Sequence, residues 1–191
     1  MLPDTRFVPD YLDTAAASSL FDALMVRVDW QSDAVTVYGR THPIPRLHQW
    51  YADAGLDYRW SGLTMEPRTW LPELQAMRDQ LNNELDAGFN SVLANLYRNG
   101  NDSMGWHADD EAELGGQPVI ASISLGATRD FDLRFTDAEA AIPDRRIPLT
   151  HGSLLLMQGN TQHQWKHALP KRKAVVAPRI NLTFRRLAAT R

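Results

Sequence analysis

The chain changes its residue pattern at Gly88, and this change most constrains how it can fold. Beyond Gly88, short apolar runs alternate with turn-forming residues, which is typical of β-strands. The predicted strands cover residues 91–97, 119–125, 131–135, 145–149, 153–157, 162–167 and 179–186. Because so many short strands need a second layer to bury their apolar faces, we expect a β-sandwich or barrel.

The residues before Gly88 contain two helical patterns instead. Asp13 and Thr14 precede an apolar-rich run that ends at Val28, and Asp is a common N-cap residue. A second helix is predicted over residues 67–87, with Gly88 as its stop signal. Its apolar face would consist of Trp70, Leu74, Met77, Leu81 and Leu85. Helices followed by strands predict the α+β fold class.

Composition excludes several classes of protein. A chain of 191 residues without cysteine is large enough for one domain with its own core, and it has no disulfides, zinc–thiolate sites or cysteine nucleophile. Any metal must therefore bind to His, Asp or Glu. The sequence has no apolar run long enough to span a membrane and no signal-peptide pattern, so we expect a cytoplasmic protein without membrane contact. Residues 171–191 contain seven of the 20 Lys and Arg residues and no acidic residue, a pattern that suits phosphate contact or a solvated surface.

The last predicted strand has one apolar and one polar face. Alternation places its Ile, Leu and Phe side chains together, and Arg179, Asn181, Thr183 and Arg185 on the opposite face. An ordinary half-buried strand would show the same pattern. However, residues 91–97 place Asn95 and Tyr97 on one side in the same way, and two such strands could line a pocket for a carboxylate, which guanidinium groups recognise.

His107 and Asp109 form half of a metal site. Two residues apart, they project to the same side if the segment is extended. A third ligand is needed, and His151, His163 and His167 are the candidates. Two imidazoles and one carboxylate leave open positions that suit a non-haem ferrous ion.

Taken together and in this order, the motifs of the chain resemble those of the AlkB-type 2-oxoglutarate and iron(II)-dependent dioxygenases, especially the AlkB homologues that repair double-stranded DNA. The resemblance extends from about Val37 to Arg186. The matching motifs are VYGRTHPIPR, DAGLDYRWSGLT, Asn95-Leu-Tyr97, His107-Ala-Asp109, ASISLGATRDF, HGSLLLMQG, His167-Ala-Leu-Pro170 and Arg179-Ile-Asn181-Leu-Thr183-Phe-Arg185.

The resemblance implies a double-stranded β-helix, or jelly roll, with helices packed outside it. It implies a single dioxygenase domain over residues 1–191, with helices and a nucleotide-recognition segment in 1–90 and the catalytic core in 91–186. His107, Asp109 and His167 would bind Fe(II), with His163 as the competing third ligand.

The same resemblance implies a site for the co-substrate 2-oxoglutarate. Arg179 would pair with its distal carboxylate, assisted by Tyr97 and Asn181. Arg185 and Asn95 would face the end nearest the iron. Thr183 shares this face, as a contact of the co-substrate or as a packing neighbour.

The implied reaction uses O2 to demethylate 1-methyladenine and 3-methylcytosine in alkylated DNA, with RNA as an alternative substrate, and it releases formaldehyde. A target base in a duplex must first be flipped out. Substrate contacts would include Tyr38 as a wedge that fills the gap. Tyr58 and Trp60 would line the base pocket, Asp110 and Glu111 would lie beside the flipped base, and Arg46 would contact phosphate, as would Lys171, Arg172 and Lys173.

Two other functional classes fit parts of this pattern. An oxygenase that acts on RNA, protein or a small metabolite would keep the iron and 2-oxoglutarate residues without the aromatic pocket. A non-catalytic jelly-roll module would have lost a metal ligand or an arginine, and none is missing.

We further expect the protein to be a monomer.

Overall fold

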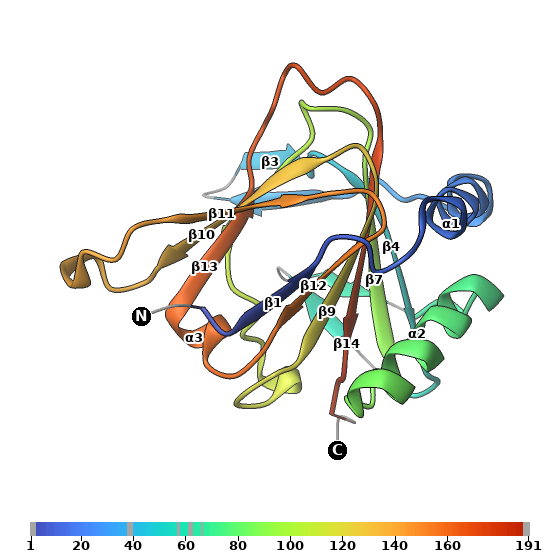
Figure 1. Ribbon diagram of the computed structural model, residues 1–191, viewed down its shortest axis with the longest axis horizontal. Helices are drawn as coiled ribbons and strands as arrows, with labels where there is room; N and C mark the ends of the chain where they lie inside the picture. The colour runs from blue at the N-terminus through green and yellow to red at the C-terminus, as the bar shows by residue number, and fades with distance from the viewer. Residues whose placement is uncertain (1–2, 38–39, 57, 61–62, 66, 189–191) are drawn as a thin grey trace.

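The computed structural model describes residues 3–37, 40–56, 58–60, 63–65 and 67–188, which form mainly antiparallel strands (Figure 1). The six-stranded major sheet consists, in spatial order, of β1 (Thr5–Val8), β12 (Ser153–Met157), β9 (Ile120–Gly126), β14 (Arg179–Arg185), β7 (Ser91–Tyr97) and β4 (Leu47–Ala52). The four-stranded minor sheet consists of β11 (Arg145–Leu149), β10 (Arg129–Phe135), β13 (Trp165–Leu169) and β8 (Met104–His107). The major sheet therefore takes both of its edge strands from the first 90 residues.

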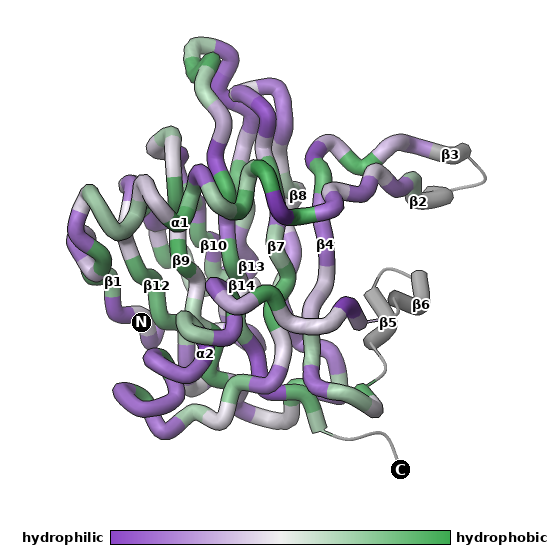
Figure 2. The backbone as a smooth tube through the Cα atoms, turned by 90° about the vertical axis from the view of Figure 1, so that its right-hand side faces the viewer, coloured by the Kyte–Doolittle hydropathy of each residue, from purple (hydrophilic) through white to green (hydrophobic). Residues whose placement is uncertain are grey.

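The strands of the major sheet can be followed from β1 to β4 across Figure 2, and two separate short hairpins complete the set of strands. They are β2 (Ala34–Val37) with β3 (Arg40–Pro43), and β5 (Tyr58–Trp60) with β6 (Leu63–Met65). The helices are α1 (Thr14–Arg27), α2 (Pro72–Leu85) and the single turn α3 (Thr161–Gln164), with 3₁₀ turns η1 (Ala112–Leu114) and η2 (Ala138–Ala140). Within the described residues, no helix is both long and apolar enough to cross a membrane.

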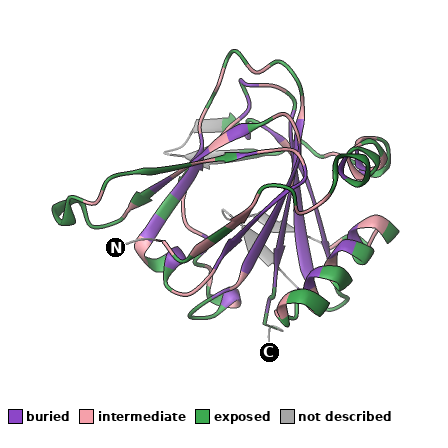
Figure 3. Cartoon of the chain, viewed as in Figure 1, coloured by how far each residue is buried: buried purple, intermediate pink, exposed green. Residues whose placement is uncertain are grey.

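The major sheet is the middle of three layers. On one face it packs against α1 and α2 through a cluster that includes Leu24, Leu74, Leu81, Ile123 and Ile180. On the other face it packs against the minor sheet, and that cluster includes Tyr97, Phe131, Leu155, Trp165 and Leu169. Figure 3 shows the result: the central strands are buried, whereas the outer helix faces and the loop between β10 and β11 are exposed. The expected β-sandwich of jelly-roll type is confirmed.

The first helix begins where the sequence predicts. Asp13 is its N-cap residue, and its Oδ1 accepts a hydrogen bond from the backbone N–H of Ala16 at 2.8 Å. This bond satisfies one of the free N–H groups of the first turn.

The second helix differs from the prediction at both ends. It begins at Pro72, not at residue 67, because Pro72 occupies its first turn, where the missing N–H group costs nothing. It ends at Leu85, before the expected stop at Gly88, and Asp86 adopts the left-handed conformation with φ 49°. Three of the predicted face residues, Leu74, Met77 and Leu81, are buried as expected.

The predicted strand 162–167 was wrong in its first half. Thr161 to Gln164 form a helical turn, and the strand β13 starts only at Trp165. The sequence pattern also missed β1, β4 and β8.

Candidate metal and co-substrate site

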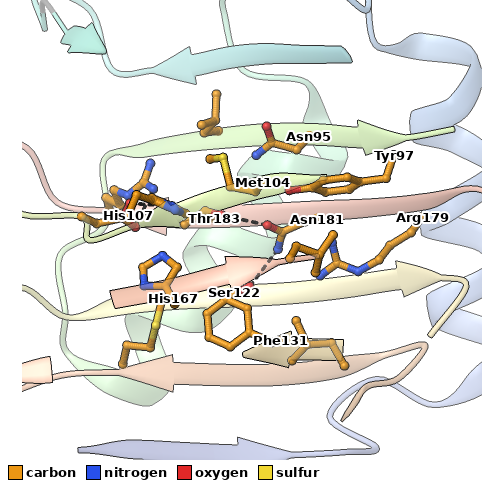
Figure 4. Close-up of a pocket in the computed structure, with 16 residues that line it drawn as sticks. Asn95, Tyr97, Met104, His107, Ser122, Phe131, His167, Arg179, Asn181 and Thr183 are labelled. Atoms are coloured by element: carbon orange, nitrogen blue, oxygen red, sulfur yellow. Dashed lines mark hydrogen bonds and ion pairs between the residues drawn. The ribbon is translucent and has the colours of Figure 1, made fainter. Parts of the chain in front are cut away.

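Three side chains that could bind a metal meet between the two sheets. His107 is the last residue of β8, and His167 lies opposite it on the neighbouring strand β13. Asp109 follows two residues after β8. One ligand atom from each of the three lies within 4.8 Å of the others, and only His107 is partly exposed, whereas Asp109 and His167 are buried. These residues lie at one end of a pocket (Figure 4).

Asp109 is held from two directions. Its backbone N–H donates to Oε1 of buried Gln162 at 2.9 Å, and its Oδ2 accepts from Nη2 of Arg185 at 2.7 Å. Its Oδ1 lies 3.7 Å from Nε2 of His107. Burial alone would raise the pKa of Asp109, but Arg185 together with the two histidines lowers it below its usual value. The carboxylate is therefore ionised and offers Oδ1 to a cation.

The two histidines also present nitrogen atoms to the site. Nδ1 of His107 lies 2.8 Å from the carbonyl oxygen of Gly105, so it donates there and leaves Nε2 as the acceptor that faces Asp109. The ring of His167 stacks on Phe131 at 5.1 Å between centroids. Burial, with a contribution from His107, lowers the pKa of His167 to about 3 and keeps the imidazole neutral. Two imidazoles and one carboxylate fit the facial donor set of a non-haem ferrous ion.

Arg179 lies at the other end of the pocket (Figure 4). It is 1% exposed, and its Nη2 donates to Oγ of Ser124 at 2.9 Å. Nε and Nη1 have no hydrogen-bond partner among the described residues. Burial lowers the pKa of Arg179 to about 10, so the group remains a cation at neutral pH. A buried guanidinium with two unpaired N–H directions fits a carboxylate, such as the distal carboxylate of 2-oxoglutarate.

The polar face predicted for β14 lines this pocket. Arg179, Asn181, Thr183 and Arg185 all contribute to its wall, whereas the alternate apolar residues are in the core between sheet and helices. Nδ2 of Asn181 donates to Ser122 at 2.8 Å and to the carbonyl of Ile123 at 3.2 Å, and its Oδ1 accepts from the hydroxyl of Thr183 at 3.1 Å. The amide of Asn181 is therefore oriented by its neighbours on β9 and β14.

Asn95 and Tyr97 reach the same pocket from β7. The ring of Tyr97 lies below two guanidinium groups, with its centroid 5.3 Å from Cζ of Arg179 and 5.9 Å from Cζ of Arg129. Oδ1 of Asn95 accepts a hydrogen bond from Nε of Arg46 at 2.8 Å.

Arg46 and Arg172, both expected to contact phosphate, make contacts within the protein. Arg46 is 3% exposed, and its Nε donates to Asn95. Nε of Arg172 pairs with Asp130 at 2.7 Å. Their contact with phosphate stays a prediction.

The other predicted substrate residues are only partly described. Asp110 is exposed, and Glu111 is partly buried at the N-cap of η1. The backbone of Tyr58 and Trp60 forms β5, but their side chains, like all of Tyr38, lie outside the described residues.

The remaining candidate histidines lie away from the metal cluster. His163 is exposed on α3, and its Nε2 bonds to the carbonyl of Gly116. Nδ1 of His151 accepts from the backbone N–H of Gly126 at 2.9 Å. His48 is buried and pairs with Asp33 at 3.0 Å. These contacts match structural roles for the three residues.

Sequence reasoning missed several residues that support the pocket. Gln162 contacts Asp109, and no motif had marked it. Ser124 contacts Arg179; it lies in the motif ASISLGATRDF, but no role had been assigned to it. Arg129 is 1% exposed and donates to the carbonyls of Asn99 at 3.2 Å, Asp102 at 2.9 Å and Pro170 at 2.7 Å. It thereby joins the loops 98–103 and 170–178, which lie together near the start of β14 (Figure 1).

A family model described as the 2OG-Fe(II) oxygenase superfamily matches residues 4–185. The chain therefore belongs to this superfamily and is a dioxygenase that depends on Fe(II), 2-oxoglutarate and O2, as its motifs predicted. Among curated proteins it is similar to the DNA oxidative demethylase ALKBH2 of Homo sapiens, with 44% identity over 185 residues that cover 93% of this chain and 71% of that protein. The alpha-ketoglutarate-dependent dioxygenase alkB homolog 3 of Bos taurus is 42% identical over 188 residues, which cover 93% of this chain and 64% of that protein.

Solved structures show the same fold at much lower identity. OsALKBH1 superposes with a TM-score of 0.63 and 17% identity, covering 97% of this chain and 99% of that one. A prolyl-4-hydroxylase from Pseudomonas putida gives a TM-score of 0.61 with 16% identity, covering 96% and 93% of the two chains.

Proposed function

We propose that this protein demethylates N-alkylated bases in DNA, with 1-methyladenine and 3-methylcytosine as substrates. The observation that carries the proposal is one pocket with a His-Asp-His cluster at one end and, at the other, a buried guanidinium whose Nε and Nη1 have no hydrogen-bond partner among the described residues. Relatives at 44% identity over 92–93% of the chain bear the name DNA oxidative demethylase, which supports DNA as the substrate.

In this proposal His107, Asp109 and His167 bind Fe(II). When bound, iron, 2-oxoglutarate and O2 supply an oxidation that hydroxylates the N-methyl group, with release of succinate and carbon dioxide; the product then loses formaldehyde. The protein positions the co-substrate and the base and excludes water from the site. Arg185 holds Oδ2 of Asp109 by a hydrogen bond, and Oδ1, on the side of His107, would be the oxygen that binds the cation.

Arg179 and Tyr97 would receive the distal carboxylate, with Asn181 and Thr183 beside them and Asn95 and Arg185 nearer the metal. Because Arg179 is buried, water competes little for its N–H groups, and the charge-assisted pair gains strength. The pocket thus selects a molecule with acceptors at both ends.

Base recognition would involve the segments beyond β4. Tyr58 and Trp60 lie on β5, whereas Tyr38 lies outside the described residues and enters this proposal through the family resemblance alone. Asp110 and Glu111, directly after Asp109, would lie beside the flipped base.

The test is a panel of oligonucleotides, each with one methylated base, in single-stranded DNA, duplex DNA or RNA. Each is incubated with protein, iron, ascorbate and 2-oxoglutarate, and mass spectrometry detects loss of a methyl group. Demethylation of the DNA members supports the proposal. Turnover of the RNA members alone, or uncoupled succinate formation with no oligonucleotide product, contradicts it. A Tyr38→Ala protein should lose one to two decades of activity on duplex substrates only, since stacking contributes about 1–3 kcal/mol per base.

The single-domain organisation over residues 1–191, the monomeric state and the cytoplasmic location expected from the sequence remain predictions. Sedimentation velocity would test the oligomeric state, with a single 21.6 kDa species expected.

A further inference from the structure

Arg46 and Asn95 form a buried pair at the wall of the pocket. Each side chain is 3% exposed, and Nε of Arg46 lies 2.8 Å from Oδ1 of Asn95. The backbone on each side of the arginine is fixed: its own N–H donates to the carbonyl of Ile44 at 2.8 Å, and the carbonyl of Pro45 accepts from Ser103 at 2.9 Å. The guanidinium therefore approaches Asn95 from a rigid position at the start of β4.

This pair determines which way the amide of Asn95 points. An arginine side chain can only donate, so the atom of Asn95 that faces it must be the oxygen. The NH2 group is then turned the other way, and Figure 4 shows it directed toward the middle of the pocket. No described residue accepts a hydrogen bond from this nitrogen, although Asn95 lines the pocket and is almost fully buried. The NH2 group therefore borders the pocket with its donor capacity unused, so a ligand in the pocket can supply the acceptor.

The orientation matters because of the ligand's chemistry. The keto acid end of 2-oxoglutarate offers only acceptor oxygens. With its NH2 group inward, Asn95 can donate to them, whereas a flipped amide would present Oδ1 and repel them. Flipping is costly here because it would place NH2 against the guanidinium of Arg46, donor against donor.

We propose that Arg46 is a positioning residue for the co-substrate, because it fixes the amide of Asn95 with its NH2 group facing the pocket. This proposal rests on the 2-oxoglutarate site of the proposed function. It does not depend on DNA being the substrate. It also assigns Arg46 a role different from contact with phosphate.

The first experiment measures 2-oxoglutarate binding to the Mn(II)-loaded protein by calorimetry. Arg46→Met should raise the dissociation constant roughly tenfold, the value of one lost hydrogen bond. Arg46→Lys keeps a donor and should stay near the wild-type value. Asn95→Ala should resemble Arg46→Met, and the double variant Arg46→Met/Asn95→Ala should be no worse than Asn95→Ala alone. If the two losses multiply in the double variant, Arg46 does not act through Asn95.

A further variant removes the NH2 group of Asn95 and keeps its contact with Arg46, so that the fold is preserved. Asn95→Asp keeps an acceptor for Arg46 but removes the NH2 group. We expect weaker 2-oxoglutarate binding with a melting temperature at or above that of the wild type. Wild-type affinity in Asn95→Asp would overturn the proposal.

A DNA-binding measurement distinguishes the positioning role of Arg46 from a contact with DNA phosphate. Fluorescence anisotropy with a duplex oligonucleotide at two salt concentrations should give the same affinity and salt dependence for Arg46→Met and wild type. Weaker DNA binding with a smaller salt slope, and unchanged 2-oxoglutarate binding, would show a phosphate contact instead. If no DNA oligonucleotide of the panel is demethylated, the proposed DNA substrate is refuted. The calorimetric test of Arg46 remains valid in that case.

Discussion

Replacing Arg179 by Met should make the ligand-free protein more stable while it abolishes tight binding of 2-oxoglutarate. Arg179 is 1% exposed, and its Nε and Nη1 have no partner among the described residues. A buried charge without a counterion destabilises the folded state, and an apolar residue of similar length removes that cost. The two opposite effects have one cause, since the charge is uncompensated until a carboxylate binds.

The magnitudes follow from the geometry. Two charge-assisted hydrogen bonds, from Nε and Nη1, contribute about 1.5–3 kcal/mol each, so their loss should raise the dissociation constant by about two to four decades. If removal of the charge gains about 1–2 kcal/mol, the melting temperature of the ligand-free variant should rise by about 2–8 °C for a domain of this size. Differential scanning fluorimetry with Mn(II), with and without 2-oxoglutarate, measures both effects.

Arg129→Met is the matched control. Arg129 is equally buried and also lies against Tyr97, but its guanidinium donates to three backbone carbonyls. Loss of these bonds leaves carbonyl groups unpaired, so this variant should melt lower. The reasoning on Arg179 would be refuted if Arg179→Met lost as much stability as Arg129→Met, or if 2-oxoglutarate still raised its melting temperature as in the wild type.

Four further variants test other parts of the structure. His167→Ala should lose Mn(II) binding in calorimetry, whereas His163→Ala should keep it; the reverse result would show that the wrong histidine was assigned. Gln162→Leu should weaken Mn(II) binding about 10- to 100-fold, because it frees the backbone of Asp109, and unchanged affinity would contradict this role. Gly100→Ala should lower the melting temperature by several degrees, since its Cβ would lie 1.7 Å from the carbonyl oxygen of Arg172; an unchanged melting curve would show that the loop adapts.

The pocket wall on β14 could be predicted from sequence because strand alternation has a strict period of two. Ile180, Leu182 and Phe184 are fully buried against the helices, and the polar residues between them line the pocket. Because this pattern lies within one strand, it can be predicted without knowing which strands are neighbours in the sheet.

The third metal ligand could not be derived from local pattern alone. His163 and His167 would share a face if residues 162–167 were one strand, and that was the expectation. The turn α3 removes His163 from that face, and the register of β13 with β8 places His167 opposite His107. Register between strands separated by 57 residues is a tertiary property, and only the family resemblance favoured His167 over His163 in advance.

Arg46 illustrates a different limit. Arg46 directly follows Pro45 and precedes a strand, and a basic residue in such a turn-like segment is expected to lie at the surface. Its burial depends on the packing of β4 against β7, which pairs Leu47 with Leu96. The strand β4 itself was missed because His48 and Gln49 interrupt its apolar pattern, although both are buried.

The burial of Arg179 at one end of the pocket has a consequence for the order of binding. Arg179 and Tyr97 are almost fully buried, whereas 27% of the His107 side chain is exposed at the opposite end. A co-substrate that pairs with Arg179 therefore has to pass the metal ligands to reach it. Under the proposed function, the co-substrate would enter before the base, and succinate would leave only after the base has withdrawn. Each turnover would then require the base to leave the pocket, even where the protein stays on the same strand.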